Sequence, residues 1–190
     1  MKKVWILSIL FTLVLIGCSG SVRSLKSRPD PDGFKNIRWG TDISTLKDME
    51  KVNLDNPSNK NVVWYARKGE ILILGKAEIE STFYSFWMGS FESVWIDFEG
   101  GENLEALKKE LFKAYGKVPD SGELKDKRGM QIEQADQFYT WKGENTEMFL
   151  FYSKIRHKGN LTLNSRKIGE ERRAYEKEKK KEERLKEKGF

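Results

Sequence analysis

The sequence predicts an α+β domain built on a mainly antiparallel sheet, with one or two helices packed on one face and a charged C-terminal helical tail. Three observations lead to this prediction. Apolar residues after position 61 fall into short runs joined by turns of two to four residues, which favour antiparallel pairing. One run in the middle of the chain has helical spacing instead. From residue 166 onward, Lys, Arg and Glu alternate and apolar residues are sparse.

The folded part is expected to open with three apolar anchors, Phe34, Ile37 and Trp39. A short helix is predicted over residues 43–49, because Thr41 or Asp42 can cap it and its apolar residues have helical spacing. A loop is predicted over residues 53–61, which include Asn56, Pro57 and Ser58.

Seven strands are predicted from runs rich in β-branched and aromatic residues. Four precede the central helix, at residues 62–67, 70–74, 79–87 and 91–98. Three follow it, at residues 137–141, 146–152 and 160–164. Lys68 and Gly69 are predicted as the turn of a hairpin between the first two strands.

The central helix is predicted over residues 104–115, with Asn103 as its N-cap and Gly116 just past its end. Five of its residues form one apolar stripe: Leu104, Leu107, Leu111, Phe112 and Tyr115. The polar segment 117–136 is expected to be a long loop.

Composition and charge argue for a folded domain without a nucleic-acid-binding face. Charged residues make up 34% of the 190 residues, but aromatic residues make up 12%, and disordered chains usually lack these. The net charge of +6 belongs to the ends, since Lys2 and Lys3 contribute +2 and residues 166–188 contribute +4. The body is neutral, so no basic surface for nucleic acid is expected on it.

The N-terminus has the pattern of a signal peptide that ends in a cysteine. Residues 1–3 include two lysines, and residues 4–16 are almost entirely apolar. A helix of these 13 residues is about 20 Å long, shorter than the hydrocarbon core of about 30 Å. This length is typical of a signal-peptide core and too short for a stable span. Leu15-Ile16-Gly17-Cys18 follows, and Cys18 is the only cysteine of the chain.

These four residues resemble the lipobox of bacterial lipoproteins, in which an aliphatic residue, a tolerant position and a small residue precede an invariant cysteine. The resemblance implies cleavage between Gly17 and Cys18 and a thioether-linked diacylglycerol on the Cys18 sulfur. It also implies acylation of the new amino group by a fatty acid such as palmitate. Two or three such chains suffice for stable membrane attachment. Ser19, where an aspartate would favour the inner membrane, indicates the periplasmic face of the outer membrane.

The chain is therefore expected to have four parts. Residues 1–17 are the signal peptide, 18–33 the lipidated N-terminus and a flexible tether, 34–165 the α+β domain, and 166–190 the helical tail. The opening of the domain also resembles uncharacterised bacterial envelope proteins that begin Gly-Phe-x-x-Ile-x-Trp-Gly, here residues 33–40. That resemblance implies no particular function.

Aromatic residues are the most informative feature of the body, because some predicted strands carry rings on both faces. A half-solvated sheet should alternate apolar and polar residues. One interpretation is an exposed aromatic surface that binds a protein, peptide or glycan. The alternatives are that the sheet curls on itself or that the tail covers it. The candidate contact residues are Trp87, Trp95, Tyr139 and Trp141.

Signals for catalysis and cofactors are weak. Ser44 and Lys47 match the S-x-x-K pattern of penicillin-binding proteins, but the other sequence elements of that site are missing. Asp97 and Glu99 share a strand face and are interpreted as surface carboxylates. His157, the only histidine, is interpreted as a surface residue in a turn. We therefore expect no enzyme activity, no metal site and no cofactor.

The expected function is a non-catalytic binding or accessory module, held at the membrane by its lipid. Its expected partner is an envelope protein or a cell-wall polymer, and not nucleic acid. The alternative is an inhibitor or sequestering protein that blocks an exogenous enzyme.

Overall fold

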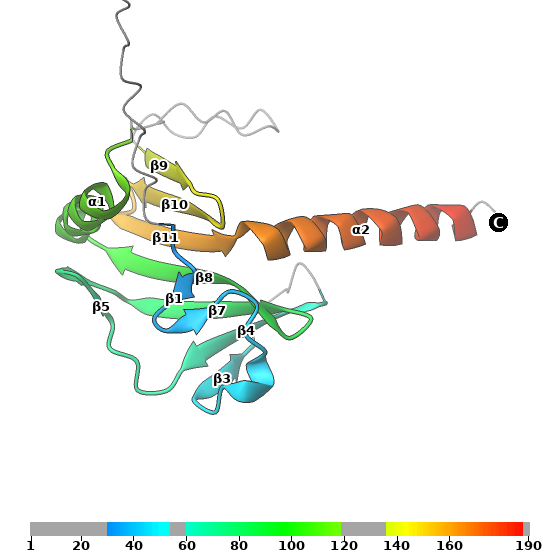
Figure 1. Cartoon of the computed structure of the whole chain (residues 1–190). Helices are drawn as coiled ribbons and strands as arrows, with labels where there is room; N and C mark the ends of the chain where they lie inside the picture. Colours follow the sequence, from blue (N-terminus) through cyan, green and yellow to red (C-terminus); the bar gives the residue numbers. More distant parts are fainter. Residues whose placement is uncertain (1–29, 54–59, 119–135, 188–190) are drawn as a thin grey trace, which may run out of the picture.

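The computed structural model describes residues 30–53, 60–118 and 136–187. A seven-stranded antiparallel sheet of strand order β3-β4-β7-β8-β11-β10-β9 forms the centre of this part of the chain (Figure 1). With a helix on one face and a C-terminal helix, it confirms the predicted α+β class. The strands are β3 (Met49–Val52), β4 (Val62–Arg67), β7 (Ser81–Trp87), β8 (Ser90–Glu99), β9 (Gln137–Lys142), β10 (Thr146–Ser153) and β11 (Lys158–Ser165).

The core lies between one face of this sheet, here called the covered face, and two elements packed on it. The helix α1 (Gly101–Tyr115) buries Leu104, Leu107 and Leu111 there. An N-terminal hairpin of β1 (Gly33–Phe34) and β2 (Ile37–Arg38) packs beside α1. The covered face contributes the buried side chains of Tyr84, Phe91, Val94, Ile96, Phe98, Met148, Leu150, Leu161 and Leu163.

The N-terminal hairpin explains why the folded part opens with apolar anchors. Its two-residue turn, Lys35–Asn36, has positive φ angles of 44° and 68°, which suit the twist of a tight hairpin. Ile37 is buried, and the rings of Phe34 and Trp39 lie 6.0 Å and 4.8 Å from aromatic rings of the sheet. The three predicted anchors are therefore confirmed.

The predicted helix over residues 43–49 is wrong. Only a single 3-10 turn, η1 (Ile43–Thr45), forms there, and the Asp42 carboxylate caps it by accepting from the Ser44 N–H at 2.8 Å. Residues 49–52 form the edge strand β3 instead. The apolar spacing has another cause, because Leu46 and Met49 pack against the core from an irregular segment.

The predicted hairpin between residues 62–67 and 70–74 is also wrong. β4 pairs with β3 along one edge and with β7 along the other, so neither edge is left for residues 70–74. β5 (Ile73–Leu74) pairs with β6 (Ala77–Glu78) in a separate two-stranded sheet. Gly75 makes the turn between them, at a φ of 63° that favours glycine.

The helix α1 starts at Gly101, earlier than predicted, because Gly100 with a φ of 88° takes the N-cap position. Asn103, the predicted N-cap, lies inside the first turn. Its side-chain amide donates to the Glu99 carbonyl at 2.8 Å, and its side-chain oxygen accepts from the Glu78 N–H at 2.8 Å. Asn103 therefore ties α1 to β8 and β6 rather than capping it.

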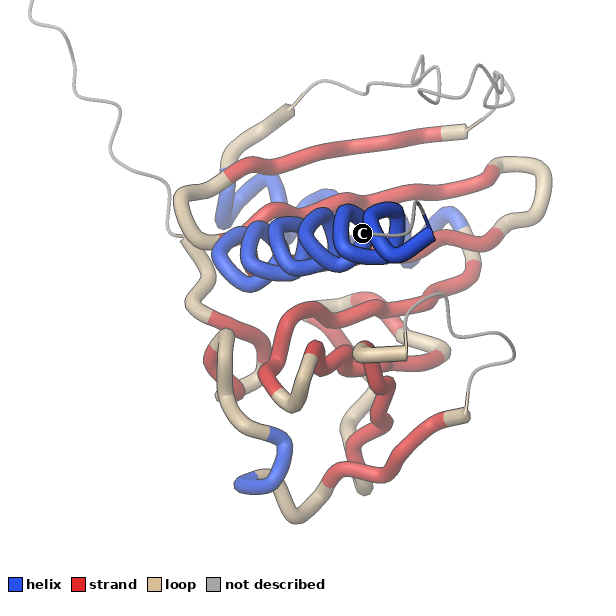
Figure 2. Tube along the Cα trace, turned by 90° about the vertical axis from the view of Figure 1, so that its right-hand side faces the viewer, coloured by secondary structure: helices blue, strands red, loops and turns tan. Residues whose placement is uncertain are grey.

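The C-terminal helix α2 (Arg166–Glu187) projects away from the sheet, in line with β11 (Figures 1 and 2). Only its first turns touch the domain. Ile168 is buried, the Arg172 guanidinium pairs with the buried Glu92 carboxylate at 3.1 Å, and the Tyr175 ring lies 5.9 Å from the Trp87 ring. All described residues after position 176 are exposed. The prediction of a charged C-terminal helical tail is confirmed for residues 166–187.

The last residues of the predicted flexible tether belong to the folded domain. The Asp30 carboxylate accepts hydrogen bonds from the backbone N–H groups of Asn145 and Thr146 in the β9–β10 turn. The Pro31 carbonyl accepts from the Thr146 hydroxyl at 2.5 Å. These hydrogen bonds hold residues 30–31 to the sheet, so these two residues are not part of a flexible tether. Gly17, Cys18 and the predicted signal peptide lie outside the described residues.

Candidate functional site

The candidate site is the sheet face opposite α1, here called the open face. The strand registers align its side chains in two neighbouring cross-strand rows. The first row is Thr140, Phe149, Thr162, Trp95 and Phe83. The second row is Phe138, Phe151, Asn160, Asp97 and Ser81. All ten side chains are partly or fully exposed, whereas their neighbours along each strand are mostly buried on the covered face.

Trp95 lies near the middle of the first row and is the most exposed ring of the two rows. It is 36% exposed, and its indole N–H donates to an Asp97 carboxylate oxygen at 2.5 Å. The Ser81 hydroxyl donates to the other Asp97 oxygen at 2.8 Å. These two hydrogen bonds fix the orientation of the indole, so that its ring is held on the surface in one position.

The rest of the open face combines rings with neutral hydrogen-bonding side chains. The rings of Phe138 and Phe149 lie 5.9 Å apart and tilted by 45°. Asn160 and Thr162 separate the rings of β10 from those of β8. An amide can both donate and accept hydrogen bonds, and so can a hydroxyl. The face can therefore bury apolar C–H surface and hydrogen-bond polar groups at once.

Tyr139 and Trp141 are not on this face, and their prediction as surface contacts is wrong. Tyr139 is 5% exposed and Trp141 is 2% exposed. Both rings pack against Phe112 of α1, and the Trp141 indole N–H donates to the Gly116 carbonyl at 2.9 Å. The physical reason is that α1 packs on the face of β9 that carries these two rings. The alternation along the strand does not indicate which face a helix will cover.

Trp87 lies beside the open face, under the start of α2. It is half-buried and makes an edge contact with the Tyr175 ring. Its indole Nε1 is buried and has no hydrogen-bond partner among the described residues. Of the four predicted residues, only Trp95 therefore presents its ring on the open face.

Sequence reasoning left four phenylalanines of the open face out of the candidate set: Phe83, Phe138, Phe149 and Phe151. Each alternates along its strand with residues that the structure buries. The strand registers are the signal that could have found them. Once Val94 and Ile96 are assigned to the core, the pairing of β8 with β7 and β11 puts the opposite parity of every strand on the open face.

The acidic residues near Lys158, Glu99 at the end of β8 and Glu80 just before β7, make contacts typical of a surface. Glu99 and Glu80 lie 3.7 Å and 3.8 Å from the Lys158 ammonium. A hydrogen bond shared with Glu99 raises the pKa of the Glu80 carboxyl above its ordinary value. His157 is exposed in the β10–β11 turn. In the part of the chain that the structure describes, no group of three or more His, Cys, Asp or Glu side chains could hold a metal ion.

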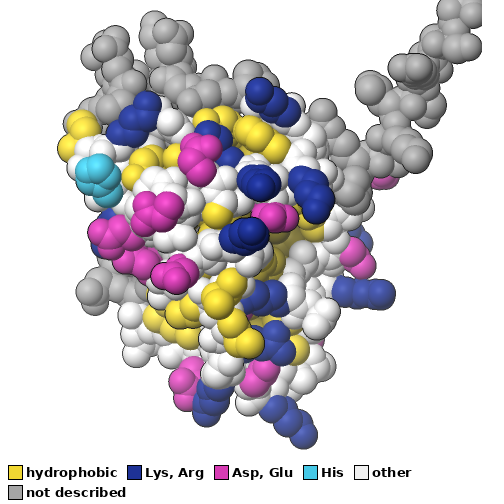
Figure 3. Space-filling model, turned by 90° about the vertical axis from the view of Figure 1, so that its left-hand side faces the viewer, with side chains coloured by type: hydrophobic (Ala, Val, Ile, Leu, Met, Phe, Trp, Pro, Cys, Tyr) yellow, Lys and Arg dark blue, Asp and Glu magenta, His cyan; other side chains and the backbone are white. Residues whose placement is uncertain are grey.

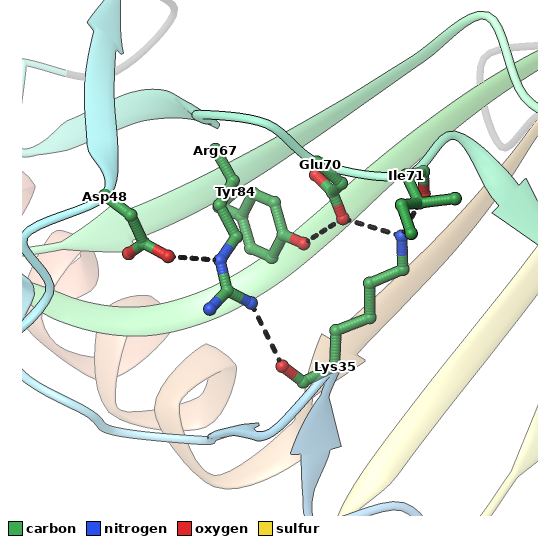
Figure 4. Close-up of polar contacts among 6 residues, drawn as sticks. All are labelled: Lys35, Asp48, Arg67, Glu70, Ile71 and Tyr84. Atoms are coloured by element: carbon green, nitrogen blue, oxygen red, sulfur yellow. Dashed lines mark hydrogen bonds and ion pairs between the residues drawn. The ribbon is translucent and has the colours of Figure 1, made fainter.

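A second polar cluster lies at the N-terminal hairpin (Figure 4). The Glu70 carboxylate accepts from the Tyr84 hydroxyl at 2.6 Å and pairs with the Lys35 ammonium at 2.8 Å. Asp48 accepts from the Arg67 guanidinium at 2.6 Å, and this hydrogen bond lowers the pKa of Asp48 below its ordinary value. Burial raises the pKa of the Tyr84 hydroxyl well above its ordinary range, so this phenol stays protonated.

This polar cluster attaches the N-terminal hairpin to the rest of the domain. The Arg67 guanidinium also donates to the Lys35 carbonyl at 3.2 Å, and the Lys35 ammonium donates to the Ile71 carbonyl at 2.8 Å. The cluster therefore links the hairpin to β4 and to the segment before β5. Its charged groups are paired with one another, which is typical of a structural role.

Comparisons with protein-family models, with curated proteins and with solved structures found no match to this chain. Within residues 30–53, 60–118 and 136–187, no helix combines the length and the apolar character that crossing a membrane requires.

Proposed function

We propose that this chain is a membrane-anchored envelope lipoprotein whose domain is a non-catalytic binding module for cell-wall glycan, with the open face as its binding surface. One observation carries the proposal. Five rings, those of Phe83, Trp95, Phe138, Phe149 and Phe151, lie partly exposed in two adjacent rows between neutral polar side chains.

The chemistry of a glycan matches this face. A sugar ring has an apolar C–H face that can be buried against an aromatic ring, and hydroxyls at its edge that need hydrogen-bond partners. The open face offers both, with Asn160, Thr162 and Thr140 between the rings. A contiguous, partly exposed aromatic surface of this kind is typical of a binding site.

The lipid anchor rests on the sequence alone. The cationic start, the 13-residue apolar segment and the Leu15-Ile16-Gly17-Cys18 motif support acylation of Cys18. Metabolic labelling with an alkyne fatty acid tests it. Label is expected on the wild-type chain and not on Cys18→Ser, and label of equal strength on both would contradict the anchor.

Glycan binding is tested by co-sedimentation of a chain beginning at Ser19 with purified peptidoglycan sacculi. The double variant Trp95→Ala, Phe149→Ala is expected to lose most of its sedimentation, because it removes two rings of the same row. Leu185→Ala is the matched control, since it removes a 45% exposed apolar side chain from the far end of α2. Equal sedimentation of the double variant and wild type would overturn the proposal.

A further inference from the structure

An apolar pocket opens on the α1 side of the domain, away from the open face. Its volume is about 420 Å³, within the range of roughly 300–1,000 Å³ that small-molecule sites occupy. The walls come from α1, the N-terminal hairpin, β5 and the covered face of the sheet, and include Phe34, Leu74, Leu107, Leu111, Met148 and Leu163. Figure 3 shows this side of the molecule, with hydrophobic side chains in a hollow bordered by charged ones.

Three of the residues that line the pocket are small. Gly33, Gly75 and Ala114 line it between the larger apolar side chains. At Gly75 the β5–β6 turn approaches α1 so closely that a Cβ atom would lie 2.7 Å from the Glu110 side chain. The hairpins therefore meet α1 at the rim, while the space behind the rim remains lined by leucine and methionine.

The rim carries the Glu110 carboxylate and the Lys35 ammonium, and the Lys35 ammonium is paired with the Glu70 carboxylate at 2.8 Å. The lining residues behind them are apolar and offer few hydrogen-bonding groups. A ligand that fits both parts has an apolar chain and a cationic group that can face the Glu110 carboxylate. Phosphatidylethanolamine has this chemistry, with acyl chains and a headgroup ammonium.

Three consecutive apolar residues lie in water next to the pocket. Ile71, Leu72 and Ile73 are 73%, 37% and 54% exposed, and Leu74, which follows them, lines the pocket. The Lys35 ammonium holds the Ile71 carbonyl at 2.8 Å, so these residues are fixed to the rim (Figure 4). Such a run of exposed apolar side chains is typical of a surface that contacts an apolar partner.

The lipid anchor would hold this rim close to a bilayer. The described chain begins at Asp30, which is hydrogen-bonded to the β9–β10 turn, and Pro31 lines the pocket. Eleven residues separate Cys18 from Asp30. A chain of that length spans at most about 40 Å even when it is fully extended. A membrane anchored through Cys18 therefore lies within reach of the pocket mouth.

We propose that this pocket takes up one acyl chain of a bilayer phospholipid, while Ile71, Leu72 and Ile73 contact the lipid surface. The inference rests on the proposed membrane anchor and assigns a second, lipid-binding role to the opposite side of the domain. It is independent of what the open face binds.

Photo-cross-linking tests the proposal on the mature, acylated protein. The protein is reconstituted into vesicles of phosphatidylethanolamine and phosphatidylglycerol, with a fraction of the phosphatidylethanolamine carrying a diazirine in one acyl chain. After irradiation, mass spectrometry is expected to find cross-links on pocket residues such as Leu111 and Met148. Cross-links confined to Ile71–Ile73, or none in the described domain, would overturn the pocket.

A variant that fills the pocket mouth and its matched control sharpen the test. Ala114 is exposed on α1 and lines the pocket, whereas Ala174 is exposed on α2 and does not. Ala114→Trp is expected to abolish cross-links to Leu111 and Met148, and Ala174→Trp to leave them at the wild-type level. Thermal unfolding of both variants checks that each is folded. Unchanged pocket cross-links in folded Ala114→Trp would overturn the proposal.

The source of the acyl chain is tested by moving the diazirine. Protein is prepared from cells fed a diazirine fatty acid, so that the chain on Cys18 carries the label, and is placed in unlabelled vesicles. A cross-link from this chain to the pocket would show that the protein's own acyl chain occupies the pocket. That result would overturn uptake of a bilayer lipid. The mass of the N-terminal peptide tests the anchor separately. If Cys18 carries no acyl mass, the proposed anchor fails, but full-length Cys18→Ser chain in the first set of vesicles still reports whether the pocket binds lipid.

Discussion

The two faces of the central sheet are built from the same strands but have different chemistry. On the covered face, side chains such as Val94, Leu150 and Leu161 are fully buried under α1 and the N-terminal hairpin. On the open face, the side chains one position along, such as Trp95 and Phe149, remain partly exposed. The aromatic content of the two faces is similar, so composition alone does not distinguish them.

Because of this difference, alternate side chains along each strand have different roles, one set in stability and the other in binding. The covered face has a partner layer within the molecule, and its side chains contribute to the free energy of folding by leaving water. The open face has no described helix over its two rows, so its rings contribute less to folding and remain available for another molecule. Neighbouring residues on one strand should therefore respond differently to the same substitution.

The largest effect is expected for the pair Leu150→Ala and Phe149→Ala. Leu150 is 0% exposed, so its truncation should lower the free energy of unfolding by about 2–5 kcal/mol. Phe149 is only partly buried, so Phe149→Ala should lower the free energy of unfolding by about 1 kcal/mol or less and should weaken binding at the open face. Urea denaturation of both variants measures the two values. Equal losses would mean that the open face is buried by part of the protein.

A smaller loss of stability is expected from Gly159→Ala on the covered face. A Cβ atom there would lie 2.4 Å from the Phe98 ring and 2.5 Å from the Phe151 carbonyl, so the strands must shift at a cost of about 1–3 kcal/mol. Gly101→Ala is the control, because its Cβ would meet only the Tyr152 hydroxyl at 3.8 Å. Thermal unfolding should show a lower midpoint for Gly159→Ala alone. A midpoint like that of wild type would show that β10 and β11 are not so closely paired.

The substitution Glu92→Gln tests how the buried Glu92 carboxyl, which pairs with Arg172 of α2, affects the stability of the domain. Burial raises the pKa of the Glu92 carboxyl above its ordinary value. The carboxyl therefore ionises at lower pH in the unfolded chain, and the stability it contributes is lost as the pH rises through the unfolded value of about 4.3 towards the folded value.

The free energy of unfolding of Glu92→Gln, taken relative to that of wild type, should therefore be higher at pH 7 than at pH 4. Chemical denaturation at the two pH values measures the difference, which includes the loss of the ion pair with Arg172 at 3.1 Å. A variant whose free energy of unfolding differs from that of wild type by the same amount at both pH values would contradict a raised pKa.

The smallest effect is expected from ending the chain after Glu176. All described residues beyond this position are exposed on α2, whereas Arg172 and Tyr175, which touch the sheet, are retained. The thermal unfolding midpoint should stay within experimental error of the full chain. A lower midpoint would show that the projecting part of α2 stabilises the domain.

Local signals predicted many elements close to their observed bounds. The run 62–67 coincides with β4, and the predicted strands 137–141, 146–152 and 160–164 lie within β9, β10 and β11. The amphipathic stripe predicted α1 and its buried leucines. Gly116, just past the predicted end, is the C-cap, since its N–H donates to the Phe112 carbonyl at 3.0 Å.

The errors occurred where a distant segment decided the outcome. Residues 70–74 form no hairpin with β4 because β3 and β7 already occupy both of its edges. Asn103 does not cap α1 because its side chain bonds to β6 and β8. Asp30 and Pro31 belong to the domain because the β9–β10 turn binds them. These are contacts over long sequence separations, which local patterns do not encode.

The sequence by itself determined the periodicity of the chain: which segments alternate, which form a helical stripe, and where a lone cysteine follows an apolar leader. Only the tertiary structure decided which parity of each strand is buried. Trp141 and Trp95 both lie in strands of the sheet, but Phe112 of α1 packs on the ring of Trp141, whereas Trp95 lies on the open face and is 36% exposed. The reason is physical, since alternation divides a strand into two faces, and only the packing of another element removes one of them from water.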